Sequence, residues 1–140
     1  MRAFALQRFV DAQTPVWGDV LAELAQARKR SHWMWFVFPQ LAALGCSGTA
    51  KFYGISGAEE ARAYLAHPVL GARLQECCAL LLQAKGVSAQ DIFGEIDAMK
   101  LRSCLTLFEA VSPQAPIFRQ CLDRYFAGER DALTSELLAR

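Results

Sequence analysis

Apolar residues recur at the three- and four-residue spacing of amphipathic helices along almost the whole chain. The first such stripe covers residues 6–13, and the second covers residues 17–24 with acidic and amide side chains on the opposite face. Further stripes follow between residues 56 and 126, and a last turn covers residues 132–138. Clean two-residue alternation, the pattern of a half-buried strand, is absent from the sequence. The pattern therefore predicts an all-α fold.

The helix over residues 17–24 is expected to end in the three cations of residues 28–30, which are favourable near the negative end of a helix dipole. Ser31 is then placed to cap a helix over residues 32–38, before Pro39. This segment is also aromatic enough to form a strand, and periodicity does not decide so short an apolar run. We predict a helix because the sequence offers no second strand to pair with it.

Side chains that cap helices mark several later starts. Ser56 followed by Glu59 matches a capping box, Ser88 is placed to cap a short turn, and Asp97 is expected to cap the helix that follows it. Linkers and internal repeats are absent from the sequence. We therefore predict one compact domain, residues 1–140, built from about six to nine short helices.

The composition supports a folded domain of this kind. The 140 residues are 54% hydrophobic and 21% charged, whereas disordered chains combine low hydrophobicity with high charge. A net charge of +1 provides no chain-wide basic field, so we expect neither a nucleic-acid partner nor attachment to acidic membranes. The most apolar stretch, residues 33–44, is broken by Pro39 and Gln40 and is shorter than the roughly twenty residues that span a bilayer.

The cysteines give no pattern of disulfides or metal ligands. There are five, Cys77 and Cys78 are adjacent, and no CxxC pair is present. The N-terminal sequence MRAFALQRFVDAQ lacks the apolar core and cleavage site of a signal peptide. We expect reduced, structural thiols in a cytoplasmic protein, with no metal and no cofactor.

The most distinctive segment is RKRSHWMWFVFPQ, residues 28–40, in which three cations precede a histidine and four aromatic residues. One interpretation is a buried central helix, with Trp33, Phe36 and Phe38 in the core. The other is a ligand-binding wall, in which cations bind phosphate or carboxylate and an indole face binds a ring. A helix start at Ser31 would add free N–H groups that favour an anion.

His32 is the candidate catalytic residue. An imidazole in its neutral form suits a general base or a hydrogen bond to a ligand. The alternative is a histidine that binds a backbone carbonyl. His67, just before Pro68, is interpreted as part of a turn. Neither histidine has an acidic residue three or four positions later, so the sequence predicts no metal site.

Polar residues on otherwise apolar helix faces raise a second question. Lys100, Ser103 and Thr106 recur at three-residue spacing, Gln13 continues the apolar stripe of its own helix, and Gln40 follows Pro39. Buried polar groups without partners cost about 1–3 kcal/mol, so these side chains either line a polar pocket or face solvent. Phosphate-binding and nucleophile motifs of the types GxxxxGK[ST], GxGxxG and GxSxG are absent, which does not support ordinary ATP hydrolysis.

Several segments between about Leu6 and Phe126 resemble the DUF1810 family. They are LQRFVDAQ, RKRSHWMWFVFPQL, YGI, ARAYLAHPVLGARL, KLRSCLTLF and FRQCLDRYF. The resemblance implies a small, mainly helical and mostly bacterial protein, and it implies no reaction. The family has also carried the label calpastatin, but calpastatin-type inhibitors are disordered and this composition predicts a folded chain.

The chain is also distantly similar to NADAR-type N-glycosidases, which act on ADP-ribose-like or ribosyl-linked substrates. These proteins carry an SEHYFQA-type helix and a later K…L…KF helix. The corresponding residues here are Ser31, His32 and Trp33, followed by Lys100, Leu105 and Phe108. The acidic residue between the serine and the histidine is missing from this chain.

Three functional hypotheses follow, and the sequence leaves open whether the protein is an enzyme. The first is a pocket that binds or hydrolyses a nucleotide- or ADP-ribose-like phosphorylated small molecule, with His32 as the base. The second is a non-enzymatic protein-interaction or regulatory module, and the third, disfavoured by the net charge, is a local nucleic-acid contact. Convergence of His32, Trp35 and Lys100 on a hollow would favour the first. Its ligand-binding residues are Lys29, Arg30, Ser31, Trp35, Gln40, Tyr53 and Lys100.

Overall fold

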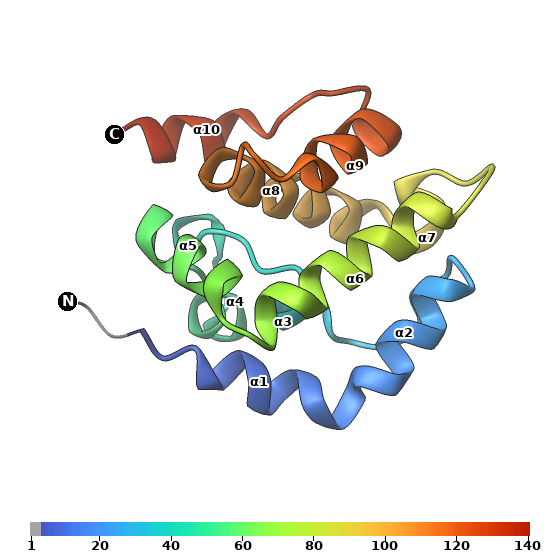
Figure 1. Ribbon diagram of the computed structural model, residues 1–140, viewed down its shortest axis with the longest axis horizontal. Helices are drawn as coiled ribbons and strands as arrows, with labels where there is room; N and C mark the ends of the chain where they lie inside the picture. Colours follow the sequence, from blue (N-terminus) through green and yellow to red (C-terminus); the bar gives the residue numbers. More distant parts are fainter. Residues whose placement is uncertain (1–3) are drawn as a thin grey trace.

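The computed structural model describes residues 4–140, which fold into helices joined by turns (Figure 1). This described part contains ten α-helices and two short 3-10 helices. The N-terminal half holds α1 (Gln7–Gln13), η1 (Thr14–Val16), α2 (Trp17–Ala25), α3 (Met34–Val37), η2 (Ala42–Leu44), α4 (Gly48–Phe52) and α5 (Ala58–Ala66). The C-terminal half holds α6 (Leu70–Gln83), α7 (Ala89–Phe93), α8 (Glu95–Val111), α9 (Pro116–Phe126) and α10 (Ala132–Ala139). The prediction of an all-α fold is confirmed.

Extended backbone is confined to short connections in the described residues. The only β-type pairing there is one parallel bridge between Leu41 and Ile55. Three of the α-helices, α3, α4 and α7, have only four or five residues. Helices this short form because tertiary contacts hold them, since a helix nucleus is costly by itself.

Helix α8 is the most enclosed element of the fold. It packs against α5, α7, α9 and α10, and Figure 1 shows it beneath α9 and α10, with α6 crossing the middle of the view and α1 and α2 below. Apolar residues occupy most of its circumference, so it forms the centre of the core. The predicted core residues Trp33 and Phe38 are buried, whereas Phe36 is only partly buried.

Four of the five cysteines are buried in the core, as expected for structural thiols. All five are free; Cys46 is exposed, and the other four are buried. Burial in the apolar core raises the pKa of Cys77 far above its ordinary value. The buried thiol therefore stays protonated and unreactive at neutral pH.

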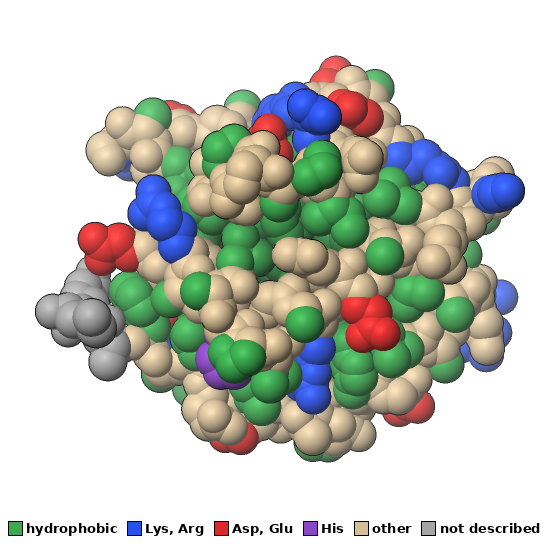
Figure 2. All heavy atoms as spheres, in the orientation of Figure 1, with side chains coloured by type: hydrophobic (Ala, Val, Ile, Leu, Met, Phe, Trp, Pro, Cys, Tyr) green, Lys and Arg blue, Asp and Glu red, His purple; other side chains and the backbone are tan. Residues whose placement is uncertain are grey.

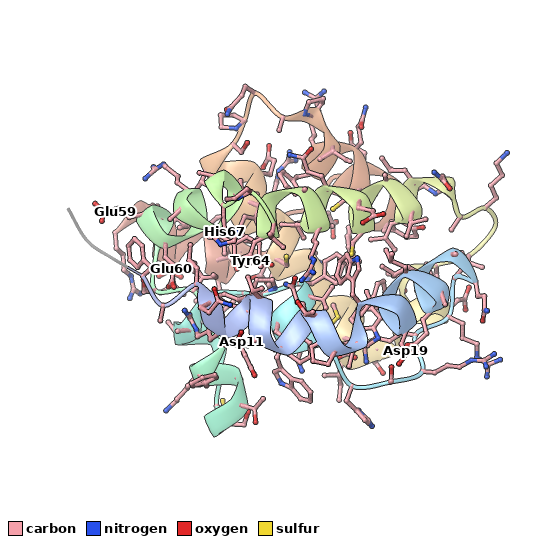
Figure 3. All side chains as sticks on the ribbon, turned by 60° about the horizontal axis from the view of Figure 1, so that its bottom comes forward. Asp11, Asp19, Glu59, Glu60, Tyr64 and His67 are labelled. Atoms are coloured by element: carbon pink, nitrogen blue, oxygen red, sulfur yellow. The ribbon has the colours of Figure 1, made fainter. Side chains whose placement is uncertain are left out.

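Polar side chains connect α1 to α5 (Figure 3). The amide of Gln13 donates hydrogen bonds to the Phe36 carbonyl at 2.6 Å and to the Tyr64 hydroxyl at 3.1 Å. Arg8 forms an ion pair with the buried Glu60 at 3.0 Å. Because its amide is used inside the core, Gln13 is a structural residue and does not line a ligand pocket.

Two local predictions about helix starts are confirmed. Ser88 forms a capping box with Asp91 at the start of α7. The Nδ1 atom of His67 accepts a hydrogen bond from the Val69 N–H at 3.1 Å, so His67 stabilises the turn before α6. Both depend on residues two or three positions apart, which is why the sequence was sufficient to predict them.

Two other predicted caps are wrong. Ser56 does not cap α5; its N–H donates to the Glu60 carboxylate at 2.7 Å, and Glu59 is exposed. Asp97 lies within the first turn of α8, because this helix begins two residues earlier, directly after Gly94. Gly94 has a φ of 81°, which glycine adopts easily, and this conformation separates α7 from α8.

Helix α2 ends earlier than predicted. Ala27 adopts a left-handed φ of 56°, and the Arg28 N–H turns back to the Glu23 carbonyl at 2.9 Å. This arrangement is a Schellman motif, which closes the helix before the three cations of residues 28–30. The cations therefore follow the helix and do not end it.

Replacing Ala27 with glycine should raise the free energy of unfolding by about 0.5–1 kcal/mol, because glycine adopts left-handed φ without steric cost. The matched control is Ala25→Gly, at a helical position of the same element, which should lower it by about 1 kcal/mol. Urea denaturation of both variants measures the difference. Equal destabilisation by the two substitutions would contradict the proposed strain at Ala27.

Candidate functional site

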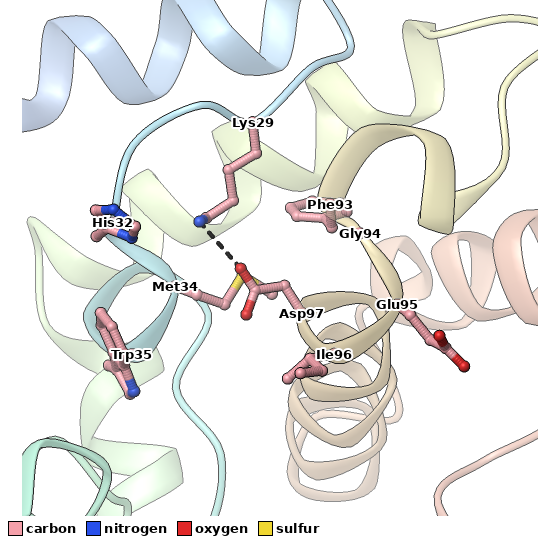
Figure 4. Close-up of a pocket in the computed structure, with 9 residues that line it drawn as sticks. All are labelled: Lys29, His32, Met34, Trp35, Phe93, Gly94, Glu95, Ile96 and Asp97. Atoms are coloured by element: carbon pink, nitrogen blue, oxygen red, sulfur yellow. Dashed lines mark ion pairs between the residues drawn. The ribbon is translucent and has the colours of Figure 1, made fainter.

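An open cleft with a volume of about 480 Å³ lies between the segment that follows α2 and the start of α8 (Figure 4). This volume is in the range of small-molecule sites. The residues that line it are Lys29, His32, Met34, Trp35, Phe93, Gly94, Glu95, Ile96 and Asp97.

One carboxylate joins two lysines at this cleft. The Asp97 carboxylate lies 3.0 Å from Lys29 Nζ and 3.5 Å from Lys100 Nζ. The Lys29 side chain is 9% exposed and that of Lys100 is 25% exposed. Figure 4 shows Glu95 pointing away from Lys29 and Trp35. Because Glu95 also borders the cleft, the two lysines and two carboxylates of this region balance in formal charge.

Indole rings lie beside both cations. The Nζ atom of Lys29 is 5.1 Å from the centre of the Trp33 ring, and that of Lys100 is 5.1 Å from the Trp35 ring. Distances below about 6 Å allow a cation–π attraction. Trp33 is buried against Phe93 at a centroid distance of 6.4 Å, whereas Trp35 is partly exposed and borders the cleft.

The Glu23 carboxylate holds the segment that carries these side chains. It accepts hydrogen bonds from the Arg30 N–H at 2.7 Å, the Ser31 N–H at 3.0 Å, the Ser31 hydroxyl at 2.6 Å and the Trp33 indole at 3.0 Å. Burial acts to raise the pKa of Glu23, but the hydrogen bonds outweigh it and lower the pKa to about 2. At neutral pH the carboxylate is therefore charged and fixes the path of residues 30–33.

A backbone contact fixes the position of Lys29. Its N–H donates to the Ile92 carbonyl at 2.8 Å, which ties the segment after α2 to α7. Because α7 continues through Gly94 into α8, Lys29 is held close to Asp97 in the first turn of α8. The backbone of Lys29 is therefore attached to α7 and its side chain to α8.

A family model described as "Protein of unknown function (DUF1810)" matches residues 3–138. The chain belongs to the DUF1810 family. The crystal structure at 1.38 Å of the conserved hypothetical protein Rv1873 from Mycobacterium tuberculosis is similar to this chain, with 50% identity, a TM-score of 0.96 and coverage of 98% of each chain. The search of curated proteins found no match to this chain.

These comparisons confirm the resemblance to DUF1810, and they extend it beyond the predicted span of about residues 6–126. Neither the description of the family nor that of the mycobacterial protein gives a reaction. The similarity to NADAR-type N-glycosidases stays a prediction, and the label calpastatin finds no support in either description.

Most of the candidate residues of this DUF1810 protein lie close together. Lys29, His32 and Trp35 border the cleft. A small hollow of about 10 Å³ lies beside it, lined by Met34, Trp35, Phe38, Gln40, Ala50, Tyr53 and Lys100. Trp35 borders both, so the structure brings six of the eight candidate side chains to one region.

Two candidate residues do not join the cleft. Arg30 is exposed, and Ser31 uses both its N–H and its hydroxyl to bind Glu23. The sequence predicts that Ser31 caps a helix over residues 32–38, but α3 covers only Met34–Val37. The predicted anion site at a helix start beside Ser31 is therefore wrong.

The polar residues of α8 have different roles. Thr106 is structural, since its hydroxyl donates to the Arg102 carbonyl at 2.7 Å and accepts from the Asp131 N–H at 2.9 Å. Ser103 donates to the Met99 carbonyl at 3.2 Å and borders a further hollow on the same helix. Only Lys100 directly faces the region around Trp35.

The sequence did not identify Glu23, Asp97 or Ile96 as parts of the site. Asp97 precedes Lys100 by three positions, a spacing that indicates a helical ion pair. Glu23 and Ile96 gave no comparable signal, because their neighbours in the site come from other segments of the chain.

Two further findings concern residues 4–140 as a whole. No group of three or more histidine, cysteine, aspartate and glutamate side chains there is placed to hold a metal ion. No helix in the described part of the chain is long and apolar enough to cross a membrane. On the face shown in Figure 2, lysine and arginine side chains are dispersed among polar and apolar ones.

Proposed function

We propose that the cleft binds a nucleotide- or ADP-ribose-like phosphorylated small molecule. The observation that carries this proposal is the Asp97 carboxylate between two lysines, at the edge of a cleft bordered by an indole ring. This arrangement combines an apolar face, a hydrogen-bond acceptor and two ammonium groups. A nucleotide needs all three, for its base, its ribose hydroxyls and its phosphate.

The ring of the ligand packs between Trp35 and Ile96. Trp35 is only partly exposed, while Ile96 is 72% exposed on the opposite side of the cleft. Stacking of a base on an aromatic side chain is worth about 1–3 kcal/mol. A flat ring covers both side chains and removes their apolar surface from water.

The two lysines take different parts in this proposal. Lys29 is the more buried, and its distance of 3.0 Å to Asp97 makes it the structural partner of the carboxylate. Lys100 is more exposed and lies 3.5 Å from Asp97. Turning its side chain from Asp97 to a phosphate therefore costs less free energy than turning that of Lys29. Asp97 retains one ion pair and accepts hydrogen bonds from ribose hydroxyls.

His32 is the candidate catalytic residue, because it is exposed at the rim of the same cleft. In hydrolysis of an N-glycosidic bond, its imidazole takes a proton from water, the hydroxide adds to the anomeric carbon, and the carbon–nitrogen bond breaks. The imidazolium then returns the proton to the leaving nitrogen. His32→Ala is expected to keep ligand affinity and to lose turnover.

Replacing Trp35 with alanine should weaken ligand binding by about tenfold or more, because the stacking face is lost. AMP, adenosine and ADP-ribose are screened by thermal shift, and their affinities are then measured by calorimetry. A ligand at about one hundred times its dissociation constant stabilises the protein by about 2.7 kcal/mol, or several degrees.

Trp17→Ala is the matched control, since this partly buried tryptophan lies under Arg73 and outside the residues that line the cleft. It should not change affinity. If AMP, adenosine and ADP-ribose all left the melting temperature of the protein unchanged, the proposal would be overturned. The protein-interaction hypothesis would then be favoured by the exposed apolar side chains Ile96, Met99 and Leu133.

A further inference from the structure

A second hollow, with a volume of about 300 Å³, lies along α8 next to the cleft. Ile96 borders both, and Lys100 and Gln40 border the second hollow as well as the small hollow beside Trp35. The residues that line the second hollow are Gln40, Leu44, Ile96, Met99, Lys100, Ser103, Asp131 and Leu133. Shared walls make the cleft and the second hollow neighbouring parts of one surface.

The geometry of α8 sets the spacing between the cleft and the second hollow. Ile96, Met99, Lys100 and Ser103 recur at three- and four-residue intervals and therefore share one helix face. Ser103 lies seven positions after Ile96, which corresponds to about 10 Å of helix. This length suits two ring systems joined by a short linker.

Apolar side chains are exposed at both ends of this surface. Five large apolar side chains are markedly exposed in the described part of the chain, and three of them border the cleft or the second hollow. These three are Ile96 at 72%, Met99 at 60% and Leu133 at 48% exposure. Apolar surface gathered around a hollow indicates that something covers it.

One cation, Lys100, links the second hollow to the edge of the cleft. Lys100 borders the second hollow, and its Nζ lies 5.1 Å from the Trp35 ring at the edge of the cleft. It is 25% exposed, and its ion pair with Asp97 is the longer of the two. Lys100 is therefore within reach of a ligand in either place, and Asp131 is the one acidic residue among those that line the second hollow.

We infer that the ligand has two ring systems joined by a diphosphate-like anionic linker and occupies both the cleft and the second hollow. The linker contacts Lys100, and the second ring packs on Met99 and Leu133. The Ser103 hydroxyl donates to the Met99 carbonyl, and its lone pairs remain to accept a hydrogen bond from the ligand. This inference rests on the proposed function and narrows it, because a single nucleotide fills only the cleft.

The test compares dissociation constants for ADP-ribose and AMP by calorimetry. Wild type should bind ADP-ribose about tenfold more tightly than AMP, which corresponds to about 1.4 kcal/mol. The double variant Met99→Ala/Leu133→Ala should bring this ratio close to one. Val69→Ala, an exposed apolar residue outside the second hollow, is the matched control and should keep the ratio of the wild type.

Failure of the two-ring inference and failure of the proposed function give different results in this test. Equal affinities of wild type for AMP and ADP-ribose would overturn the two-ring inference and leave the proposed function standing. A ratio that persists in the double variant would show that the second ring lies elsewhere, which also overturns the inference. Absence of binding by both compounds would overturn the proposed function itself.

Methionine oxidation gives an independent readout of the second hollow. Met99 is 60% exposed and Met34 is 1% exposed, so dilute peroxide should convert Met99 to its sulfoxide while Met34 stays intact. Saturating ADP-ribose should slow the oxidation of Met99 several-fold, and saturating AMP should not. Equal oxidation rates with and without ADP-ribose, measured by mass spectrometry, would overturn the inference.

Discussion

Replacing Glu23 with alanine is expected to lower the free energy of unfolding by about 3 kcal/mol, because hydrogen bonds to a charged acceptor contribute about 1.5–3 kcal/mol each and are not additive. Four donors from residues 30–33 converge on this carboxylate. The same variant should weaken ligand binding, since the segment that presents His32 and Trp35 loses its attachment. Urea denaturation and calorimetry measure the two effects.

The contribution of Glu23 to the free energy of unfolding should depend on pH. Its pKa is lowered from 4.5 to about 2 in the folded protein, so its contribution is fully present above about pH 4.5 and is lost as the pH falls toward 2. The difference in stability between wild type and Glu23→Gln should therefore shrink between pH 5 and pH 2. A constant difference across this range would contradict the role of the charged carboxylate.

Glu76→Ala provides the control for the loss of a glutamate. Glu76 is exposed in the middle of α6, and substitutions at such surface positions usually change stability by about 0.5 kcal/mol or less. A similar loss of stability in both variants would show that the hydrogen bonds of Glu23 contribute little.

The second large effect is expected for Gly71→Ala, which should lower the free energy of unfolding by about 3 kcal/mol. Gly71 is buried near the start of α6, and an added Cβ would collide with the backbone carbonyl oxygen of Leu65 at the end of α5. Backbone atoms cannot rotate away as side chains do, so the contact between α5 and α6 must open. Urea denaturation measures the loss.

Gly18→Ala is the matched control for this substitution. Gly18 lies within α2, and a Cβ added there meets no atom within 4 Å. Alanine should therefore stabilise the protein by about 0.5–1 kcal/mol through its higher helix propensity. If both alanine variants were stabilised, the close approach of α5 and α6 at Gly71 would be wrong.

The balance of charge at the cleft predicts that the proposed ligand is bound mainly through its rings. Asp97 neutralises part of the positive charge of Lys29 and Lys100, so the cleft attracts a phosphate only weakly through solvent. The apolar surface of Trp35, Ile96, Met99 and Leu133 provides the larger share of the expected affinity. Affinity should therefore depend little on ionic strength.

The sequence by itself determined the helical class and much of the core, and it predicted several residues of the candidate site. Apolar spacing predicted helices because a helix repeats every 3.6 residues, so the apolar positions of one helix face lie only three or four residues apart in the sequence. The turn at His67 and the cap at Ser88 were predicted for the same reason, since their partners lie two or three residues away. The concentration of cations and aromatics after residue 28 indicated where the cleft would be.

Only the tertiary structure decided how that segment runs and what it faces. The Schellman motif at Ala27 ends α2 before residues 28–30, and the Glu23 side chain then binds residues seven to ten positions away and fixes their path. Asp97 reaches Lys29 from a distant helix, while Met99 on α8 and Leu133 near the start of α10 border the same hollow. Contacts of this kind depend on how helices pack, and packing leaves no periodic signal in the sequence of one segment.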